Sequence, residues 1–479
     1  MKSPHQSPPG TSGIANQEFS RSARMGFQPV GRLLVSFSLP ALVGMVVNAT
    51  YNIVDTGFVG RLGHEAIAGL TVVWPLQLIM IALSVGVGVG ANSLIARRLG
   101  ARDPEQANHA GAQALLLAVV SGLLMMAIVL GFTDPILRLL GAQQDILPFS
   151  RAYITTIVWF APLVFLPMTC NNLIRAEGNP LLSMVIMGAS ALINIGLDPL
   201  FIFGIGPFPT LGVQGAAIAT VIARAVAVAL YLGYFASSSS GYRFRFRQFI
   251  PAPRVWGRIY AVGLPSMAIQ LSGSVVAGVA NNIVGGFGSL ALAGFGVMFR
   301  LFAFGFMPCL GINQGVLPLV GFNYGARKMG RVREVVQKGA LSATVVTTLF
   351  TILFTAIPYL LVGLFNRNPE FIALAGRGLR ITSVAFFGVG SAVVFTGFFQ
   401  GIGKAVPAMF LSLTRQLIFY LPGILVLPRL FGLDGFWTAI PLSDGLAFAA
   451  SLTWTAWMFR KLGVPLFRRG TASVPGPAP

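Results

Sequence analysis

The sequence contains an internal repeat that covers almost its whole length. At an offset of 225 residues Leu39-Pro40 falls on Leu264-Pro265, and the alignment runs without a gap until Gly100-Ala101-Arg102 falls on Gly325-Ala326-Arg327. Three further glycine pairs correspond, the last two after a deletion of five residues: Gly178 and Gly403, Gly212 and Gly432, and Gly215 and Gly435. The chain therefore consists of two related halves of about 220 residues each.

Composition predicts that both halves lie in a membrane. Hydrophobic residues make up 55% of the chain and charged residues 10%, with a mean hydropathy of +0.78, whereas soluble domains carry about 25% charged residues. Apolar runs of about 20 residues, enough to cross roughly 30 Å of hydrocarbon as a helix, lie at 33–57, 67–96, 108–131, 151–173, 181–203, 212–236, 258–284, 290–320, 334–362, 379–399, 406–428 and 436–459. We therefore predict an all-α polytopic membrane protein with twelve transmembrane helices in two six-helix lobes.

The number of spans per half determines how the two lobes are related. Six spans return each half to the side on which it began, so the lobes form a parallel repeat about an axis along the membrane normal. Of the 33 Lys and Arg residues, 23 lie in the segments on one side, 7 on the other and 3 within spans. Basic residues concentrate on the cytoplasmic side, which predicts that both termini are cytoplasmic.

These boundaries divide the chain into two lobes and three flanking segments. We expect an N-lobe at 31–236 and a C-lobe at 258–461, joined by a basic cytoplasmic linker at 237–257. Residues 1–30 are expected to be a disordered cytoplasmic N-terminus, and 462–479 a cytoplasmic tail. The first span is too long for a signal-peptide core and lacks a cleavage pattern, so it is expected to remain uncleaved.

The net charge of +20 needs no nucleic-acid partner, because membrane orientation accounts for it. In the linker, Arg243-Phe244-Arg245-Phe246-Arg247 alternates basic and aromatic residues, as nucleic-acid and lipid-headgroup surfaces do. Its place between the lobes favours an anchor at the inner leaflet. We expect a monomer embedded in the bilayer of the cell (inner) membrane, with no nucleic-acid partner.

No cofactor or metal centre is expected. Cys170 and Cys309 both lie in apolar spans, so neither a disulfide framework nor a metal site is indicated. His64 and His109 fall in short loops without the spacing of metal ligands.

Charged side chains within membrane spans are costly and mark functional sites. The charged residues in the predicted spans are Asp55, Asp198, Asp444, Arg224, Arg300 and Arg415.

Four polar residues are expected to meet in the outer half of the N-lobe. Asn194 and Asp198 are one helical turn apart and share one face of the fifth span. Asp55 lies near the outer end of the first span, and Thr220 lies within the sixth. At 1.5 Å per residue, all four lie within about 10 Å of one another in depth.

Such a cluster has the chemistry of a coupling-ion site. Carboxylate, amide and hydroxyl oxygens can replace the hydration shell of Na⁺, and a carboxyl group removed from water can exchange a proton near neutral pH. A structural alternative is that Asp198-Pro199 forms a turn that ends the span, with Asp55 in water at the interface.

The chain resembles the multidrug and toxic compound extrusion (MATE) family of antiporters. The resemblance covers about residues 30 to 460 and rests on Pro40, on Tyr51 to Gly60 with Asp55, on Asn194-x3-Asp198, and on Gly215-Ala216-Ala217-Ile218-Ala219-Thr220. It implies twelve helices in two lobes, a central substrate cavity, and efflux of amphipathic, often cationic, compounds driven by inward flow of H⁺ or Na⁺.

The resemblance also implies roles for individual residues. The ion site would comprise Asp55, Asn194, Asp198 and Thr220, and the first helix would bend at Pro40, for which a passive kink is the alternative. Tyr51, Asn171 and Met187 match or lie near cavity positions, although packing within the lobe also accounts for Met187.

The C-lobe departs from one branch of the family. That branch has a sodium site built from acids in the seventh and tenth spans, but residues 258–284 and 379–399 contain neither Asp nor Glu. The chain therefore resembles the branch that couples through the N-lobe. For Asp444 we expect a structural ion pair with Arg415 or Arg300, and the alternative is a second coupling or substrate-binding acid.

Two other functions compete with export. A flippase for lipid-linked sugars or lipids would need several basic residues in its cavity, and only Arg224, Arg300 and Arg415 are available. An intramembrane prenyl transferase would need clustered acids for Mg²⁺ and pyrophosphate, and no Asp-rich pair occurs in a cytosolic loop. We therefore expect a secondary transporter and not an enzyme.

Overall fold

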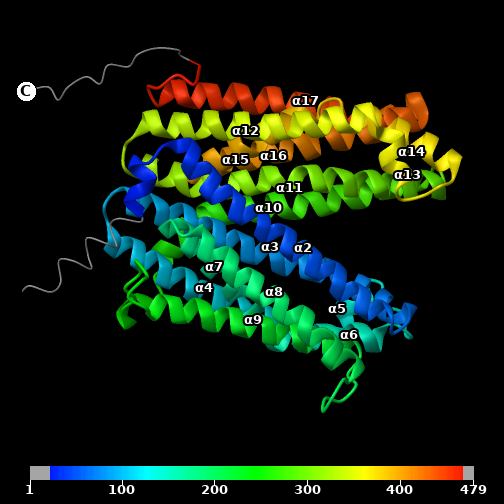
Figure 1. The fold of residues 1–479 in the computed structure, drawn as a ribbon, viewed down its shortest axis with the longest axis horizontal. Coiled ribbons are helices and arrows are strands. Elements are labelled where there is room, and N and C mark those ends of the chain that lie inside the picture. The colour runs from blue at the N-terminus through cyan, green and yellow to red at the C-terminus, as the bar shows by residue number, and fades with distance from the viewer. Residues whose placement is uncertain (1–21, 468–479) are drawn as a thin grey trace, which may run out of the picture.

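The computed structural model describes residues 22–467, which form helices and connecting turns without a strand. Figure 1 shows two groups of long helices, one from each half of the chain. The helices of the N-lobe are α2 (Val30–Gly60), α3 (His64–Gly100), α4 (Pro104–Gly131), α5 (Thr133–Leu139), α6 (Leu147–Trp159), α7 (Ala161–Glu177), α8 (Pro180–Phe203) and α9 (Val213–Ala236). The disorder predicted for residues 1–21 and the cytoplasmic tail predicted for 468–479 concern residues outside the described part of the chain. Residues 22–27 are helical, so the disorder predicted for them is wrong.

The C-lobe repeats this series of elements. Its helices are α10 (Pro253–Gly285), α11 (Ser289–Gly325), α12 (Met329–Ala356), α13 (Pro358–Gly363), α14 (Pro369–Thr382), α15 (Val389–Gly401), α16 (Ala405–Leu413) and α17 (Leu421–Lys461). A π-helix at Thr414–Tyr420 joins α16 to α17, and two short 3-10 helices occur at Phe246–Phe249 and Phe386–Gly388.

The described helices make up the twelve predicted spans. Nine are long and apolar enough to cross a membrane, and two bent pairs raise the number to eleven. One of the nine runs over 57 residues, Ala405–Lys461, roughly 85 Å at 1.5 Å per residue and far more than a bilayer requires. It divides at Gly432, whose φ of 58° and ψ of −143° are not helical, and the division supplies the twelfth span.

The backbone confirms the repeat residue by residue. Left-handed φ angles recur at matching positions in the pairs Gly63 and Gly288, Arg102 and Arg327, Gly178 and Gly403, and Gly212 and Gly432. The fourth span is bent in both lobes, by 59° between α6 and α7 and by 50° between α14 and the segment that contains α15. Corresponding helices run in the same direction, as a parallel repeat requires.

The start of α4 follows from residues visible in the sequence. The side chain of Asp103 caps α4 by accepting a hydrogen bond from the backbone N–H of Gln106 at 3.1 Å, and Pro104 occupies the first turn. Both features are typical of a helix start, because the first N–H groups of a helix lack partners within it and proline has no N–H group.

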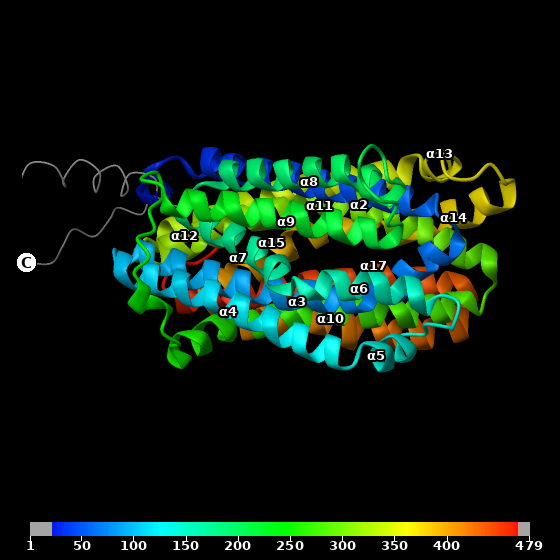
Figure 2. The ribbon, with the colours of Figure 1, turned by 90° about the horizontal axis from the view of Figure 1, so that it is seen from below.

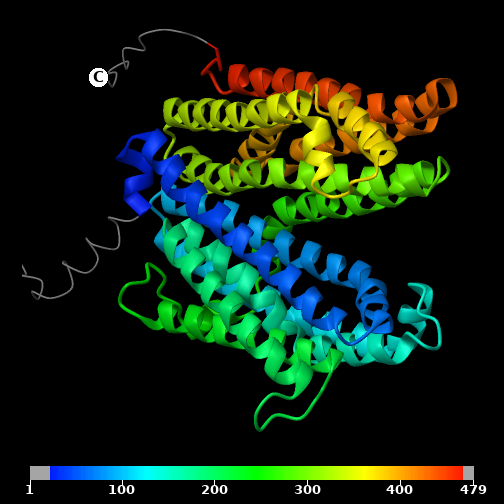
Figure 3. The same cartoon turned by 45° about the vertical axis from the view of Figure 1, so that its right-hand side comes forward.

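The two lobes meet at one end of the molecule, which we call the basic end. It comprises the α3–α4, α11–α12 and α15–α16 turns, the linker before α10, and both ends of the described chain. The opposite end comprises the α2–α3, α8–α9 and α10–α11 turns. In Figure 3 the lobes converge at the basic end and diverge toward the opposite end.

The apolar cores explain this arrangement. At the basic end, one core joins Phe37 of α2 to Val316 of α11, and another joins Ile95 of α3 to Ile259 of α10. Helices α3 and α10 accordingly lie side by side in Figures 1 and 2. The two cores at the opposite end, among the described residues, each belong to one lobe.

Glycines allow the close approach of the lobes at the basic end. A Cβ added at Gly100 would lie 1.9 Å from the carbonyl oxygen of Phe322, and one added at Gly325 would lie 2.0 Å from that of Arg97. These are repeat-related positions in α3 and α11, so the symmetric contact requires glycine on both sides.

The linker packs against the N-lobe. The amide of Gln113 in α4 donates hydrogen bonds to the carbonyl oxygens of Gln248 and Ile250 at 2.6 and 2.7 Å. The rings of Phe244 and Tyr242 stack with their centroids 5.3 Å apart. The side chain of Phe246, by contrast, is 92% exposed. One aromatic residue of the alternating motif thus packs on the protein, and another remains at the surface.

Candidate functional site

The N-lobe contains a buried polar cluster near the opposite end. Asp198 is completely buried, and Asn194 and Asp55 are nearly so. Helix α8 continues past Asp198 and Pro199 to Phe203, so the alternative of a span-ending turn at Asp198-Pro199 is wrong. The aspartate lies within the helix, one turn from Asn194, as the four-residue spacing predicts.

Asn194 connects α8 to α9. Its side-chain N–H group donates to Oδ1 of Asp198 and to Oγ1 of Thr220, each at 3.3 Å. Asp55 approaches from α2, which packs along α8, and its carboxylate is close enough to Asp198 for the two to interact electrostatically. The structure therefore brings together the four residues of the predicted cluster.

Three oxygen atoms in this cluster accept no hydrogen bond from any described residue. They are Oδ1 of Asp55, Oδ1 of Asn194 and Oδ2 of Asp198. Buried polar atoms without partners are rare, and each calls for an explanation such as a bound ion or water. Two carboxylate oxygens and one amide oxygen suit Na⁺, and the same carboxylates can take up protons.

Tyr153 and Gln77 extend the cluster and were not among the predicted site residues. Tyr153 of α6 is buried within electrostatic reach of both Asp55 and Asp198. Its hydroxyl accepts a hydrogen bond from Gln77 of α3 at 3.2 Å. Both are polar residues inside predicted spans, so a search for uncharged polar groups in the spans would have found them.

The predicted cavity residues form two further groups. Tyr51 accepts a hydrogen bond from the guanidinium of Arg224 at 3.3 Å. Asn171 lies 3.5 Å from the hydroxyl of Tyr231 and 3.9 Å from the sulfur of Met187. Met187 also packs against α2, because a Cβ added at Gly44 would lie 2.3 Å from its methyl group.

Pro40 lies inside α2, which runs as one helix from Val30 to Gly60. Because proline has no N–H group, the carbonyl of Ser36 lacks its usual helical donor at this point. Pro265 occupies the matching position in α10.

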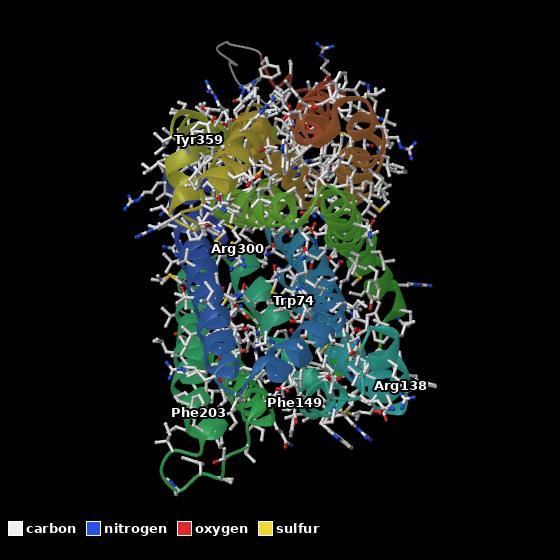
Figure 4. All side chains as sticks on the ribbon, turned by 90° about the vertical axis from the view of Figure 1, so that its right-hand side faces the viewer. Trp74, Arg138, Phe149, Phe203, Arg300 and Tyr359 are labelled. Carbon is white, nitrogen blue, oxygen red and sulfur yellow. The ribbon has the colours of Figure 1, made fainter. Side chains whose placement is uncertain are left out.

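The C-lobe acid pairs with Arg415. The guanidinium of Arg415 donates to Oδ1 of Asp444 at 2.7 Å, and the two side chains are 36% and 4% exposed. Arg415 lies in the π-helix Thr414–Tyr420. Arg300, the other predicted partner, is exposed on α11, and Figure 4 shows it toward the space between the lobes, as it does Trp74.

Comparison with known proteins adds independent evidence. The chain matches the family model MatE over residues 40–200 and 254–425. It is 28% identical over 425 residues to the multidrug export protein MepA of Staphylococcus aureus (strain MSSA476), covering 88% of this chain and 93% of MepA.

Solved structures show the same architecture. A MATE in the straight conformation superposes with a TM-score of 0.86 at 26% identity, over 92% of this chain and 99% of that one. The outward-facing conformation of a multidrug resistance MATE family transporter of the MOP superfamily gives a TM-score of 0.84 at 25% identity, over 95% and 99%.

Proposed function

The chain belongs to the MATE family of multidrug and toxic compound extrusion transporters, and from this premise we propose that it exports amphipathic, often cationic, compounds by antiport. Inward flow of H⁺ or Na⁺ drives the export through the cluster of Asp55, Asn194, Asp198 and Thr220. The protein is a secondary transporter, and the compounds and the ion are its cargo.

The observation that carries this proposal is the set of unpartnered oxygens in the cluster. Three oxygens on α2 and α8 accept no hydrogen bond from described residues, although leaving them unsatisfied in an apolar lobe is costly. A proton or Na⁺ bound there removes this cost. An ion that binds one arrangement of the helices more tightly than another shifts the population between them.

The contacts between the lobes support alternating access. Their shared cores lie at the basic end, whereas the opposite-end cores belong to single lobes. With both termini and the basic end in the cytoplasm, this is the state that opens to the outside. Rocking of the lobes then exposes a substrate between them to each side in turn.

The arginines within the spans favour export over a lipid flippase. Arg224 donates to Tyr51 and Arg415 to Asp444, so two of the three arginines already have partners. A flippase for a pyrophosphate-linked lipid would need these groups for its headgroup.

Replacement of the two N-lobe acids tests the coupling site. Asp55→Asn and Asp198→Asn keep the size of each side chain but remove its exchangeable charge, so each is expected to reduce gradient-driven export about tenfold or more, as loss of a coupling free energy of about 1–3 kcal/mol implies. The double variant should be little worse than either single variant, because the acids act together. Export of a cationic dye is measured in vesicles under separate H⁺ and Na⁺ gradients.

Asp434→Asn is the matched control. Asp434 lies at the opposite end in an exposed ion pair with Arg377, and its replacement should leave export unchanged. Normal export by Asp198→Asn, with protein levels equal to wild type, would exclude the N-lobe coupling site.

A further inference from the structure

A cavity of about 700 Å³ lies between the lobes at the basic end, far along the helices from the acid cluster. The last turns of α3 line it with Arg97 and Arg98, and the first turns of α10 with Arg258. The last turn of α11 contributes Tyr324, and the α11–α12 turn contributes Arg327. Because α3 belongs to the N-lobe and the other elements to the C-lobe, a molecule bound there would contact both lobes.

The cavity is strongly basic. Four arginines line it, and none of its lining residues is acidic. The carboxylate of Asp103 lies 3.9 Å from Arg98 and already accepts a hydrogen bond from the backbone of Gln106. Arg97 is held in place by hydrogen bonds to Ser93 Oγ at 2.8 Å and to the carbonyl oxygen of Gly401 at 3.4 Å.

These positive charges repel one another in the absence of an anion. An anion with several oxygens removes the repulsion and accepts charge-assisted hydrogen bonds from guanidinium groups.

The backbone at Arg327 has a conformation that is unusual for an arginine. Its φ of 56° lies in the left-handed region, which is unfavourable for residues other than glycine, Asn and Asp. A glycine would form this turn at lower cost, so the turn itself does not require arginine. Strain of this kind concentrates at binding sites, and here it accompanies a side chain that lines the cavity.

The repeat supplies an internal contrast. Arg102 has the same backbone conformation, with a φ of 58°, and lines a neighbouring cavity of about 380 Å³. That cavity also contains Glu105 and Glu177, so its charge is mixed. Of these two cavities, the one between the lobes is therefore better suited to an anion.

We propose that the cavity between the lobes binds a phosphate-bearing anion, which bridges arginines of both lobes and holds the lobes together at the basic end. Its volume is in the range of small-ligand sites, about 300–1,000 Å³. The phosphate group can come from the headgroup of an anionic phospholipid or from a soluble phosphoanion. Binding does not depend on the proposed export, whereas the effect on the lobes rests on alternating access.

Binding is tested with the purified full-length protein in nanodiscs. In one arm, phosphatidylcholine nanodiscs are titrated with inorganic pyrophosphate by calorimetry. In the other, nanodiscs of phosphatidylcholine and phosphatidylglycerol contain no soluble phosphate, and retained phosphatidylglycerol is measured by native mass spectrometry. Binding in the first arm alone identifies a soluble phosphoanion, and binding in the second alone identifies a lipid headgroup.

Two double variants of equal charge separate the site from the general potential of the basic end. Arg258→Gln with Arg327→Gln removes two cavity arginines and should weaken binding about tenfold or more, since charge-assisted hydrogen bonds are lost. The control double variant is Arg254→Gln with Arg102→Gln. Arg254 is exposed in α10 one turn from Arg258, and Arg102 is the repeat counterpart of Arg327. This control should weaken binding by less than about twofold.

Equal weakening in both double variants would overturn the proposal, as would the absence of binding by wild type in both arms. Gel filtration and thermal melting establish that each variant is folded. These binding measurements contain no transported substrate, so a loss of anion binding can be told apart from a loss of export.

The effect on the lobes is measured by spin-label distances. Gln143→Cys and Arg367→Cys place labels on exposed residues of the two lobes at the opposite end, and the native Cys170 and Cys309 are buried. The bound anion should increase the population with the longer distance, and the cavity double variant should abolish this increase. Binding without such a shift would exclude the bridging role.

Discussion

At the residue scale, the buried acids of the two lobes differ in their hydrogen-bond partners. In the C-lobe, Asp444 has a guanidinium partner in Arg415. In the N-lobe, Asp55 and Asp198 each retain a carboxylate oxygen without a described donor. A carboxylate that already has a cationic partner is stabilised in its charged form, so an exchangeable ion is expected at the N-lobe acids and a structural role at Asp444.

The Asp444 pair can be tested by removing one or both of its charges. Arg415→Gln leaves Asp444 buried without its partner and should destabilise the protein by on the order of 2 kcal/mol, less than for a fully buried pair because Arg415 is partly exposed. Arg415→Gln with Asp444→Asn should recover most of this loss and retain export. Thermal melting of the purified protein measures the first effect, and dye export measures the second. Loss of export by the well-folded double variant would indicate that Asp444 is a second coupling or substrate-binding acid.

At the element scale, repeat-related helices carry different side chains on similar backbones. Helices α2 and α10 both contain a proline at matching positions, Pro40 and Pro265. At the offset of 225 residues, however, Asp55 corresponds to Ala280. A conformational change in α2 therefore moves a carboxylate, whereas the same change in α10 does not.

This asymmetry predicts different effects for the two prolines. Pro40→Ala restores an N–H group that can donate to the carbonyl of Ser36, and it favours the straight helix by up to about 3 kcal/mol. We expect Pro40→Ala to slow export several-fold and Pro265→Ala to slow it less, with neither protein melting below wild type. Equal rates for wild type and Pro40→Ala would show that Pro40 is a passive kink.

At the scale of the whole molecule, the segment before α2, residues 25–28, bonds to the C-lobe at the basic end. Arg331 of α12 donates to the carbonyl oxygens of Met25 and Gln28 at 3.2 and 2.6 Å. Lys328 donates to that of Gly26 at 3.0 Å and lies over the ring of Phe27. These contacts join the N-terminal segment to the C-lobe in the state that the structure represents, and they therefore stabilise that state.

Removal of these hydrogen bonds should shift the equilibrium between the states that are closed and open at the basic end. Arg331→Gln loses two hydrogen bonds from a charged donor, each contributing about 1.5–3 kcal/mol, and should shift the equilibrium away from the state closed at the basic end by at least about tenfold. Arg333→Gln is the control, because Arg333 contacts Pro465 within the C-lobe. Spin-label distances across the opposite end report the populations, and an identical distribution in the two variants would contradict the prediction.

The membrane orientation is also a property of the whole molecule. Ser239 in the linker and Ser289 at the start of α11 are both exposed and lie at opposite ends, and the described native cysteines are buried. With impermeant thiol reagents, Ser239→Cys should label only from the cytoplasmic side and Ser289→Cys only from outside. Labelling of Ser239→Cys in intact cells would reverse the predicted orientation.

The sequence by itself determined the twelve spans, the parallel repeat and the shared helix face of Asn194 and Asp198. Each can be recognised from positions along the chain: the length of an apolar run, an offset between similar segments, or the spacing of two residues on one helix. The sequence also located Asp444 as a buried acid in the C-lobe, but it left both Arg300 and Arg415 as partners.

Only the tertiary structure decided which groups meet across helices. It paired Asp444 with Arg415, added Tyr153 to the acid cluster, and brought Arg97 and Arg327 of different lobes to one cavity. Such contacts depend on how each helix is rotated and tilted, which packing against neighbouring helices sets and the length of an apolar run does not.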